Sequence, residues 1–283
     1  KIEPLITENT KALMVPSLLG NIPDMEKLRA LADKYKLYFI EDSCDTLGAK
    51  FNGRPTGEYS DISTTSFYAS HVITAAAGGG MTCFHDALLA KRALLKINWG
   101  RESTLFGVHE QSENLRKRFA GVIEERPYDA KFIFSEIGYN FQPTEIHAAF
   151  GLAQLKRLPL FFKKRQKNFS SLLAFFRAYE QFFILPAQHP RAETAWLAFP
   201  LTIREGAPFS RRQITYFLEK HHIQTRPIFT GNALRQPAFA YLATSVEAKN
   251  AYPVADAIMR NGFLIGCHQG LFDHHLDRIK KIC

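Results

Sequence analysis

The hydrophobic residues of the first hundred positions fall into short runs separated by more polar text. These runs predict buried strands at residues 12–15, 37–40, 62–67 and 81–84. Between the first two, apolar residues at helical spacing over 25–35 predict a helix that opens with Pro23 in its first turn. Because strand, helix and strand follow one another at this distance, the pattern predicts a βαβ unit and an α/β domain.

The middle of the chain is predicted to be mainly helical, apart from one long excursion. Asp86 caps a predicted helix that runs to about Ile97, and residues 98–129 are polar, charged and poorly periodic. A connection of that length in a compact domain is usually functional or mobile. Residues 143–158 again predict a helix, which Pro159 ends before another continues to about Tyr179. The apolar stripe of the predicted helix at 143–158 consists of Ile146, Ala149, Phe150, Leu152, Ala153 and Leu155.

The pattern changes beyond Phe182, where strands and helices become shorter. Strands are predicted at 196–203, 223–226 and 263–267, and helices at 211–219 and 256–259. We therefore predict two domains, with residues 1–158 in a larger α/β domain and residues 159–283 in a smaller α+β domain.

Composition narrows the class of protein. The 283 residues are 46% hydrophobic and 22% charged, which is ordinary for a globular protein. The net charge of +9 is spread along the chain without a nucleic-acid-binding signature, so we expect no nucleic-acid partner, and a phosphorylated substrate would also suit it. Since no stretch is long and apolar enough for a transmembrane helix, we expect no membrane partner. The four cysteines lack zinc spacing, which favours free thiols in a reducing, cytoplasmic setting.

Candidate chemistry gathers where two predicted strands end. Asp42 closes one strand, Ser66 closes another, and His71 follows before the glycines 78–80. In open α/β sheets ligands bind just beyond the carboxyl ends of strands, and consecutive glycines let the backbone approach a ligand closely. We therefore expect a carboxylate, a hydroxyl and an imidazole to line one crevice.

Several segments together carry a family resemblance. The chain resembles the DegT/DnrJ/EryC1/StrS family of sugar aminotransferases over nearly its whole length. The segments concerned are Glu41–Gly48, Thr65–Thr74, Asn98–Arg101, Ile137–Asn140, Ala148–Leu155, Thr225–Asn232 and Gly262–Gly266. The resemblance implies the aspartate-aminotransferase fold of pyridoxal-phosphate enzymes (fold type I) and a homodimer. Most members carry the cofactor-binding lysine in a Ser-Phe-x-x-x-Lys pattern, whereas His71 stands at that position here. This is similar to the branch of 3-dehydrases that makes dideoxysugars for lipopolysaccharide. The CDP-4-keto-6-deoxyglucose type matches best and the GDP-4-keto-6-deoxymannose type is close behind, so the nucleotide stays open.

The resemblance also implies roles for individual residues. Asp42 would pair with the cofactor's pyridine nitrogen, Ser66 would donate to its phosphate, and Asn140 would reach that phosphate from the neighbouring subunit. His71 would be the base. Without a lysine, the cofactor would be held noncovalently and used as pyridoxamine 5'-phosphate. The expected reaction removes the C3 hydroxyl of a nucleotide-linked 4-keto-6-deoxyhexose.

Two further residues are candidates for holding the sugar nucleotide. Arg226 and Asn232 lie in the matching segment of the smaller domain. Equally good interpretations are that Arg226 forms a salt bridge and that Asn232 stabilises a turn, without either binding a substrate.

The sequence departs from the family pattern at two places. Reductase-coupled 3-dehydrases hold a [2Fe–2S] cluster on four cysteines, of which only Cys44 has a counterpart, so we expect no cluster and leave a partner reductase open. Ala77 replaces a usual glutamate in the glycine segment. The resemblance also implies that the family's N-terminal portion is missing from this sequence. We therefore expect the given chain to hold only part of the site.

Alternative interpretations remain open. The pairs His221–His222 and His274–His275 have no partners at zinc spacing, so we expect no metal site. An aminotransferase that works without the usual lysine and a non-catalytic relative are rivals to the dehydrase.

Overall fold

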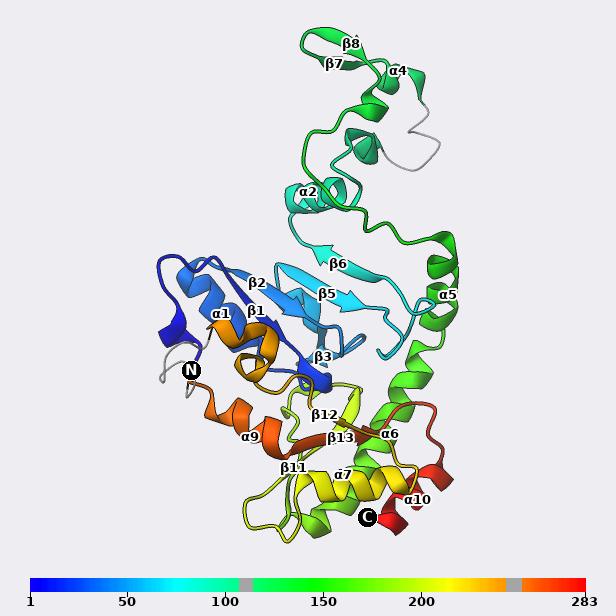
Figure 1. Cartoon of the computed structure of the whole chain (residues 1–283). Coiled ribbons are helices and arrows are strands. Elements are labelled where there is room, and N and C mark those ends of the chain that lie inside the picture. Colours follow the sequence, from blue (N-terminus) through cyan, green and yellow to red (C-terminus); the bar gives the residue numbers. More distant parts are fainter. Residues whose placement is uncertain (107–113, 243–250) are drawn as a thin grey trace.

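The computed structural model describes residues 1–106, 114–242 and 251–283. In Figure 1 a sheet of four strands occupies the middle of the molecule. A slender arm extends from it at one end, and a second sheet with its helices lies at the other end. Short 3₁₀ turns occur at Glu3–Leu5, Leu18–Gly20, Thr56–Tyr59, Glu102–Phe106, Ala130–Phe132, Arg177–Tyr179, Ala233–Arg235 and Pro237–Leu242.

The central sheet has the strand order β1-β2-β5-β6. Its strands are β1 (Ala12–Pro16), β2 (Tyr38–Asp42), β5 (Ile62–Ser66) and β6 (Gly80–Phe84). The first three run parallel, and β6 pairs antiparallel with β5. The carboxyl ends of β1, β2 and β5 therefore meet at one edge, as the βαβ prediction requires.

Helix α1 (Met25–Tyr35) covers one face of this sheet (Figure 1). It begins where Asp24 accepts a hydrogen bond from the Lys27 amide at 3.1 Å, and it buries Met25, Leu28 and Ala32. These side chains join Leu13 and Phe39 in one hydrophobic cluster. A small sheet next to this cluster consists of β10 (Ala192–Glu193), β3 (Lys50–Phe51) and β4 (Arg54–Pro55).

The arm was only partly foreseen by the sequence. It contains α2 (Ala87–Ile97), α4 (Leu115–Arg118) and a hairpin of β7 (Gly121–Ile123) and β8 (Arg126–Tyr128). The prediction of an irregular excursion missed the hairpin, because its turn is formed by Glu124 and Glu125, at φ 48° and 64°. Such turns usually carry Asn or Gly, which tolerate a positive φ. Residues 107–113 of the predicted excursion lie outside the described residues.

Helices α5 (Glu145–Leu155) and α6 (Leu158–Phe176) confirm two successive helices. The break falls at residues 156–157 and not at Pro159, because proline is tolerated in the first turn of a helix and lies there in α6. No residue of α5 is buried, and Ile146, Phe150, Leu152 and Leu155 of its predicted apolar stripe are exposed. Helix α6, in contrast, buries Phe169, Leu172 and Phe176. The apolar pattern of α5 therefore marks a face that no other described part of the chain buries.

The second sheet is antiparallel, with the order β12-β13-β11-β9. Its core is aromatic and includes Phe199 and Phe263, against which α6 packs. The strands are β9 (Phe183–Ile184), β11 (Ala198–Ile203), β12 (Thr225–Pro227) and β13 (Gly262–Gly266). The helices around it are α7 (Arg211–Lys220), α9 (Pro253–Asn261) and α10 (Asp273–Ile282). Helix α10 was not foreseen, because only Leu276 and Ile279 of its residues are buried.

The two hydrophobic clusters each draw a residue from across the predicted boundary. Leu19 belongs to the cluster of the second sheet, and Ala192 belongs to that of the central sheet. The division at residues 158 and 159 stays a prediction. Among the described residues, no helix has the length and apolar character needed to cross a membrane.

Strand β2 of the central sheet carries a buried carboxyl group. Glu41 of β2 is 1% exposed, and among the described residues neither carboxyl oxygen has a hydrogen-bond partner of ordinary geometry. Burial raises the pKa of Glu41 above its usual value. Between the unfolded and the raised folded value the native state binds more protons, so this group makes the protein less stable as the pH rises through that window.

Replacing Glu41 with glutamine is therefore expected to remove this loss. The free energy of unfolding of the variant, minus that of the parent, should increase with pH from about 4.5 upward, with a slope of at most about 1.4 kcal/mol per pH unit. Urea unfolding across the pH range measures this difference. Glu58→Gln, at an exposed residue paired with Arg54, is the matched control. A Glu41→Gln difference that does not change with pH would contradict the prediction.

Candidate active site

Asp42 and Ser66 lie on the same face of the central sheet. The register pairs Asp42 with Thr64, and Ser66 follows Thr64 by two residues on β5. Since side chains two residues apart on a strand point to the same face, Asp42, Thr64 and Ser66 share the face opposite α1. The predicted meeting of Asp42 and Ser66 therefore agrees with this register.

Hydrogen bonds hold each of these side chains in the loop that follows its strand. Asp42 is half-buried, and its Oδ1 accepts a hydrogen bond from the Cys44 amide at 3.1 Å. The Ser66 Oγ accepts from the Tyr68 amide at 3.2 Å. Burial and the Asp42 carboxylate raise the pKa of Cys44 to about 12, so this thiol stays protonated. Asp42 therefore offers the charge at this edge of the sheet.

His71 lies in a tight loop between β5 and β6. Its amide donates to the Tyr68 carbonyl at 3.0 Å, and the loop closes where the Ala75 amide donates to the Phe67 carbonyl at 2.9 Å. The His71 side chain is 17% exposed, and its Nδ1 lies 3.2 Å from Oδ1 of Asp45. The loop therefore places the imidazole just past the end of β5, next to a carboxylate.

Asp45 was not singled out from the sequence, although it stands in the Glu41–Gly48 motif. Its side chain is 8% exposed, and its Oδ2 accepts a hydrogen bond from the buried Leu19 amide at 2.8 Å. Arg165 of α6 is buried, donates to the carbonyls of Trp196 and Leu197, and attracts Asp45 electrostatically. The position of Asp45 three residues after Asp42 could have marked it as a site residue. However, no rule of sequence spacing predicts that it contacts His71.

The glycine segment beside this loop brings backbone close together. A side chain on Gly80 would approach the Thr65 carbonyl oxygen to 2.7 Å, and one on Gly78 would lie 3.1 Å from the His147 ring. Ala76 and Ala77, just before these glycines, have φ angles of 52° and 69°. The structure supplies no contact that explains alanine in place of the family's glutamate at Ala77.

Ala76→Gly is expected to stabilise the protein by about 0.5–1 kcal/mol. Glycine removes the cost of roughly 1–2 kcal/mol that alanine pays in the left-handed conformation. Glycine also has more freedom in the unfolded chain, which lowers the gain by about 0.4–1 kcal/mol. The midpoint of urea unfolding measures the effect. Ala153→Gly on the exposed side of α5 should instead destabilise by about 1 kcal/mol. Equal shifts of the two midpoints in one direction would contradict this prediction.

The other predicted residues lie on different elements. Asn140 is exposed in the segment between the arm and α5, where it forms an antiparallel bridge with Asn98. Arg226 is exposed on β12, and its Nη1 donates to the carbonyl of Thr225 at 2.9 Å. The structure does not show either residue in contact with Asp42, Ser66 or His71, and their roles stay predictions.

Asn232 is buried and occupied with neighbouring groups. Its Nδ2 donates to Oδ1 of Asp256 at 2.9 Å, and its Oδ1 accepts from the Leu234 amide at 3.1 Å. Arg235 and Asn232 hold the pKa of Asp256 well below its usual range. A substrate role for Asn232 stays a prediction, and the side chain is only 4% exposed.

The cysteines lie apart from one another. Cys44 is half-buried after β2, Cys267 is buried after β13, and Cys83 and Cys283 are exposed. Within residues 1–106, 114–242 and 251–283, no group of three or more His, Cys, Asp or Glu side chains could hold a metal ion. Part of the segment that holds cluster cysteines in the resembling enzymes, residues 107–113, lies outside the described residues.

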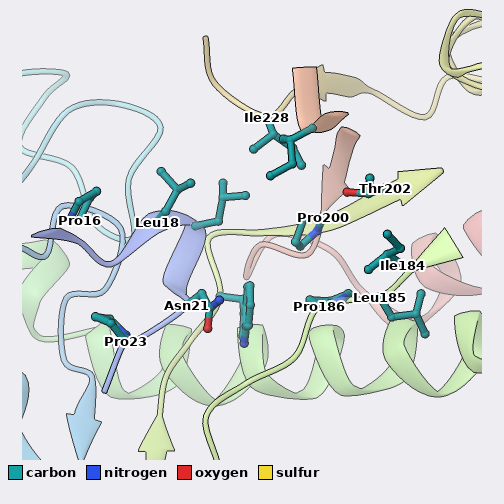
Figure 2. Close-up of a pocket in the computed structure, with 13 residues that line it drawn as sticks. Pro16, Leu18, Asn21, Pro23, Ile184, Leu185, Pro186, Pro200, Thr202 and Ile228 are labelled. Carbon is teal, nitrogen blue, oxygen red and sulfur yellow. The ribbon is translucent and has the colours of Figure 1, made fainter. Parts of the chain in front are cut away.

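Several cavities lie around the site, among them one of about 320 Å³ lined by Phe67, Ala75 and Gly79 of the His71 loop. A second of about 900 Å³ lies along β5, β6 and α2 and is lined by Thr64, Gly80 and Phe141 among others. Another of about 430 Å³ is mainly apolar (Figure 2). Pro16 at the end of β1 and Leu18 just after it line the cavity from one side, and Pro200 of β11 and Ile184 of β9 line it from the other. It contains none of the predicted site residues.

Comparison with known proteins agrees with the motifs. The model of the DegT/DnrJ/EryC1/StrS aminotransferase family matches residues 1–282. The lipopolysaccharide biosynthesis protein RfbH of Salmonella typhimurium is 36% identical over 283 residues, which cover 98% of this chain and 63% of RfbH. The GDP-4-keto-6-deoxy-D-mannose 3-dehydratase of Yersinia pseudotuberculosis is 29% identical over 272 residues, covering 95% of this chain and 65% of that protein. The chain thus spans less than two thirds of the length of these relatives.

The fold agrees as well. The E. coli GDP-4-keto-6-deoxy-D-mannose-3-dehydratase, solved with bound hydrated pyridoxal phosphate, superimposes with a TM-score of 0.80 at 26% identity. The match covers 99% of this chain and 69% of that one. The predicted aspartate-aminotransferase-like fold of type I is therefore confirmed.

Proposed function

Because the chain belongs to the DegT/DnrJ/EryC1/StrS aminotransferase family, we propose that it is a pyridoxamine-phosphate-dependent 3-dehydrase. It removes the C3 hydroxyl of a nucleotide-linked 4-keto-6-deoxyhexose, in the biosynthesis of a dideoxysugar for lipopolysaccharide. The observation that carries the proposal is His71, which stands where most relatives have lysine and lies beside Asp45. An imidazole can move protons but cannot tether the cofactor as a lysine amine does.

The residues present fit the cofactor. Asp42 offers a half-buried carboxylate for a cationic pyridine nitrogen, and Ser66 offers a hydroxyl to the phosphate from the next strand on the same face. The lack of side chains on Gly78 and Gly80 lets the His147 ring and the Thr65 carbonyl lie close to the backbone beside this loop. When bound, the cofactor supplies an electron sink. Asn140 of a second copy reaches the phosphate, so the active form is a homodimer.

Proton transfer falls to the His71 ring. Its Nδ1 faces Asp45, so Nε2 is the atom that accepts a proton and later returns it. Because the loop that carries His71 closes back on Phe67, the ring is held close to the strand end. Arg226 binds the sugar nucleotide.

The reaction is tested by product analysis. The purified protein is incubated with pyridoxamine phosphate, L-glutamate and GDP- or CDP-4-keto-6-deoxyhexose. We expect a nucleotide sugar lighter by one oxygen atom, together with 2-oxoglutarate and ammonia, which balances the loss of the hydroxyl. A stable 4-amino sugar would instead establish the aminotransferase that the family's name suggests. No conversion and no spectral change would establish a non-catalytic relative.

The role of His71 has its own test. His71→Lys is expected to attach pyridoxal phosphate covalently, so that borohydride reduction leaves a cofactor mass on the variant and none on the parent. The variant should also shift from dehydration toward transamination. An equal, unmodified mass for both proteins would show that residue 71 does not face the cofactor.

A further inference from the structure

The imidazole of His71 presents one nitrogen to the protein interior. Its Nδ1 is buried, and Asp45 Oδ1 is the acceptor 3.2 Å from it. At this distance the contact still does not meet the geometry of a hydrogen bond, and Nδ1 has no other partner among the described residues. A buried ring nitrogen without a partner is costly, so this carboxylate is the natural receiver of an Nδ1 proton.

The orientation of the Asp45 carboxylate is set from its other side. Its Oδ2 accepts the Leu19 N–H at 2.8 Å. Leu19 is itself held, since its carbonyl accepts from the Leu197 amide at 2.8 Å and its φ of 58° fixes a turn. Arg165, which lies behind these residues, attracts the carboxylate. One oxygen of Asp45 is therefore committed to the backbone, and the other faces the imidazole.

We propose that Asp45 is the positioning residue that fixes the proton of neutral His71 on Nδ1. The inference rests on the proposed function, in which His71 is the base. With Nδ1 protonated toward Asp45, the lone pair lies on Nε2, the nitrogen turned away from the carboxylate. The same division of labour between a carboxylate and an imidazole orients the base in hydrolytic triads.

The backbone contact makes the consequence of one substitution definite. In Asp45→Asn the Leu19 N–H still needs an acceptor, so the amide oxygen takes the place of Oδ2. The amide NH₂ then faces Nδ1 of His71 and can only donate to it. Nδ1 must become the acceptor, the proton moves to Nε2, and the lone pair that serves as base is lost.

The tautomer can be measured without cofactor or substrate. Protein labelled with ¹⁵N-histidine is studied by long-range ¹H–¹⁵N correlation at about pH 8.5, roughly two units above the ordinary pKa of histidine. Loss of its signals in His71→Gln assigns the ring. We expect Nδ1–H in the parent and Nε2–H in Asp45→Asn. Asp61→Asn is the control, since Asp61 also accepts a buried amide, that of Phe39 at 2.7 Å. It should leave His71 as Nδ1–H.

The outcomes separate the two proposals. An Nε2–H ring in the parent overturns the inference even if the variant does not fold, and so does an Nδ1–H ring in folded Asp45→Asn. If both tautomers are as expected, kcat for dehydration should fall by about 10²–10⁴-fold in Asp45→Asn, with KM little changed. The expected tautomers in a protein without dehydrase activity would overturn the proposed function and the role of His71 as its base, while Asp45 would still be the residue that sets the tautomer.

Discussion

Replacing His71 with asparagine is expected to lower kcat for dehydration by about 10²–10⁴-fold, the usual contribution of a general base. Asparagine fits the same loop and can still bond to Asp45, so the fold and the binding of cofactor and sugar should survive. What it lacks is a nitrogen that takes up a proton near neutral pH. The loss should therefore appear in kcat, measured by release of the deoxygenated product, with KM changing little.

His85 provides a matched control for this substitution. It follows β6 in the same domain, is exposed, and its Nε2 lies 3.2 Å from the Gly57 carbonyl oxygen, away from the loop of His71. His85→Asn should keep kcat within a factor of about two, as expected for an exposed surface substitution. Equal activity of His71→Asn and the parent would show that another group moves the proton.

The largest expected loss of stability follows from Phe199→Ala. Phe199 is fully buried on β11, between β13 and β9 in the second sheet, and its ring lies 5.2 Å from that of Phe169 and 5.5 Å from that of Phe176. Truncation removes buried apolar surface and leaves a cavity that two sheet neighbours and α6 cannot fill. The expected cost is about 3–5 kcal/mol in the free energy of unfolding, measured by urea denaturation.

An exposed phenylalanine of the same part of the chain tests the interpretation. Phe239 lies in the turn Pro237–Leu242 and is 42% exposed. Phe239→Ala should change the free energy of unfolding by no more than about 0.5 kcal/mol. A loss below about 2 kcal/mol for Phe199→Ala would mean that the core around β11 collapses readily into the space left by the ring.

Much of this site could be foreseen because it is carried by local patterns. The strand ending at Asp42 and the strand ending at Ser66 are readable from short apolar runs, and both are present. His71 follows the second strand in one short motif, and several such motifs in order indicate the family, whose model matches residues 1–282. These features depend on residues that are neighbours in sequence, where the spacing of side chains and the backbone preferences act directly.

Other expectations depended on contacts that no local pattern encodes. The apolar stripe of α5 predicted a buried helix face, but within the part of the chain that the structure describes none of its residues is buried. Asn232, read as a candidate for substrate binding, has its amide occupied by Asp256, 24 residues further along. The hairpin with its turn at Glu124 and Glu125 was not predicted, because glutamate is not typical of the left-handed conformation that both residues adopt.

The sequence by itself determined the βαβ order, the acid and hydroxyl at the strand ends, and the imidazole that follows the second of these strands. These follow from hydrophobic periodicity and from the order of motifs. Only the tertiary structure decided that Asp45 faces that imidazole, because the contact depends on the Leu19 amide holding the carboxylate from the opposite side, across 26 residues of chain. Packing brings these three groups together, and their separations in sequence carry no trace of it.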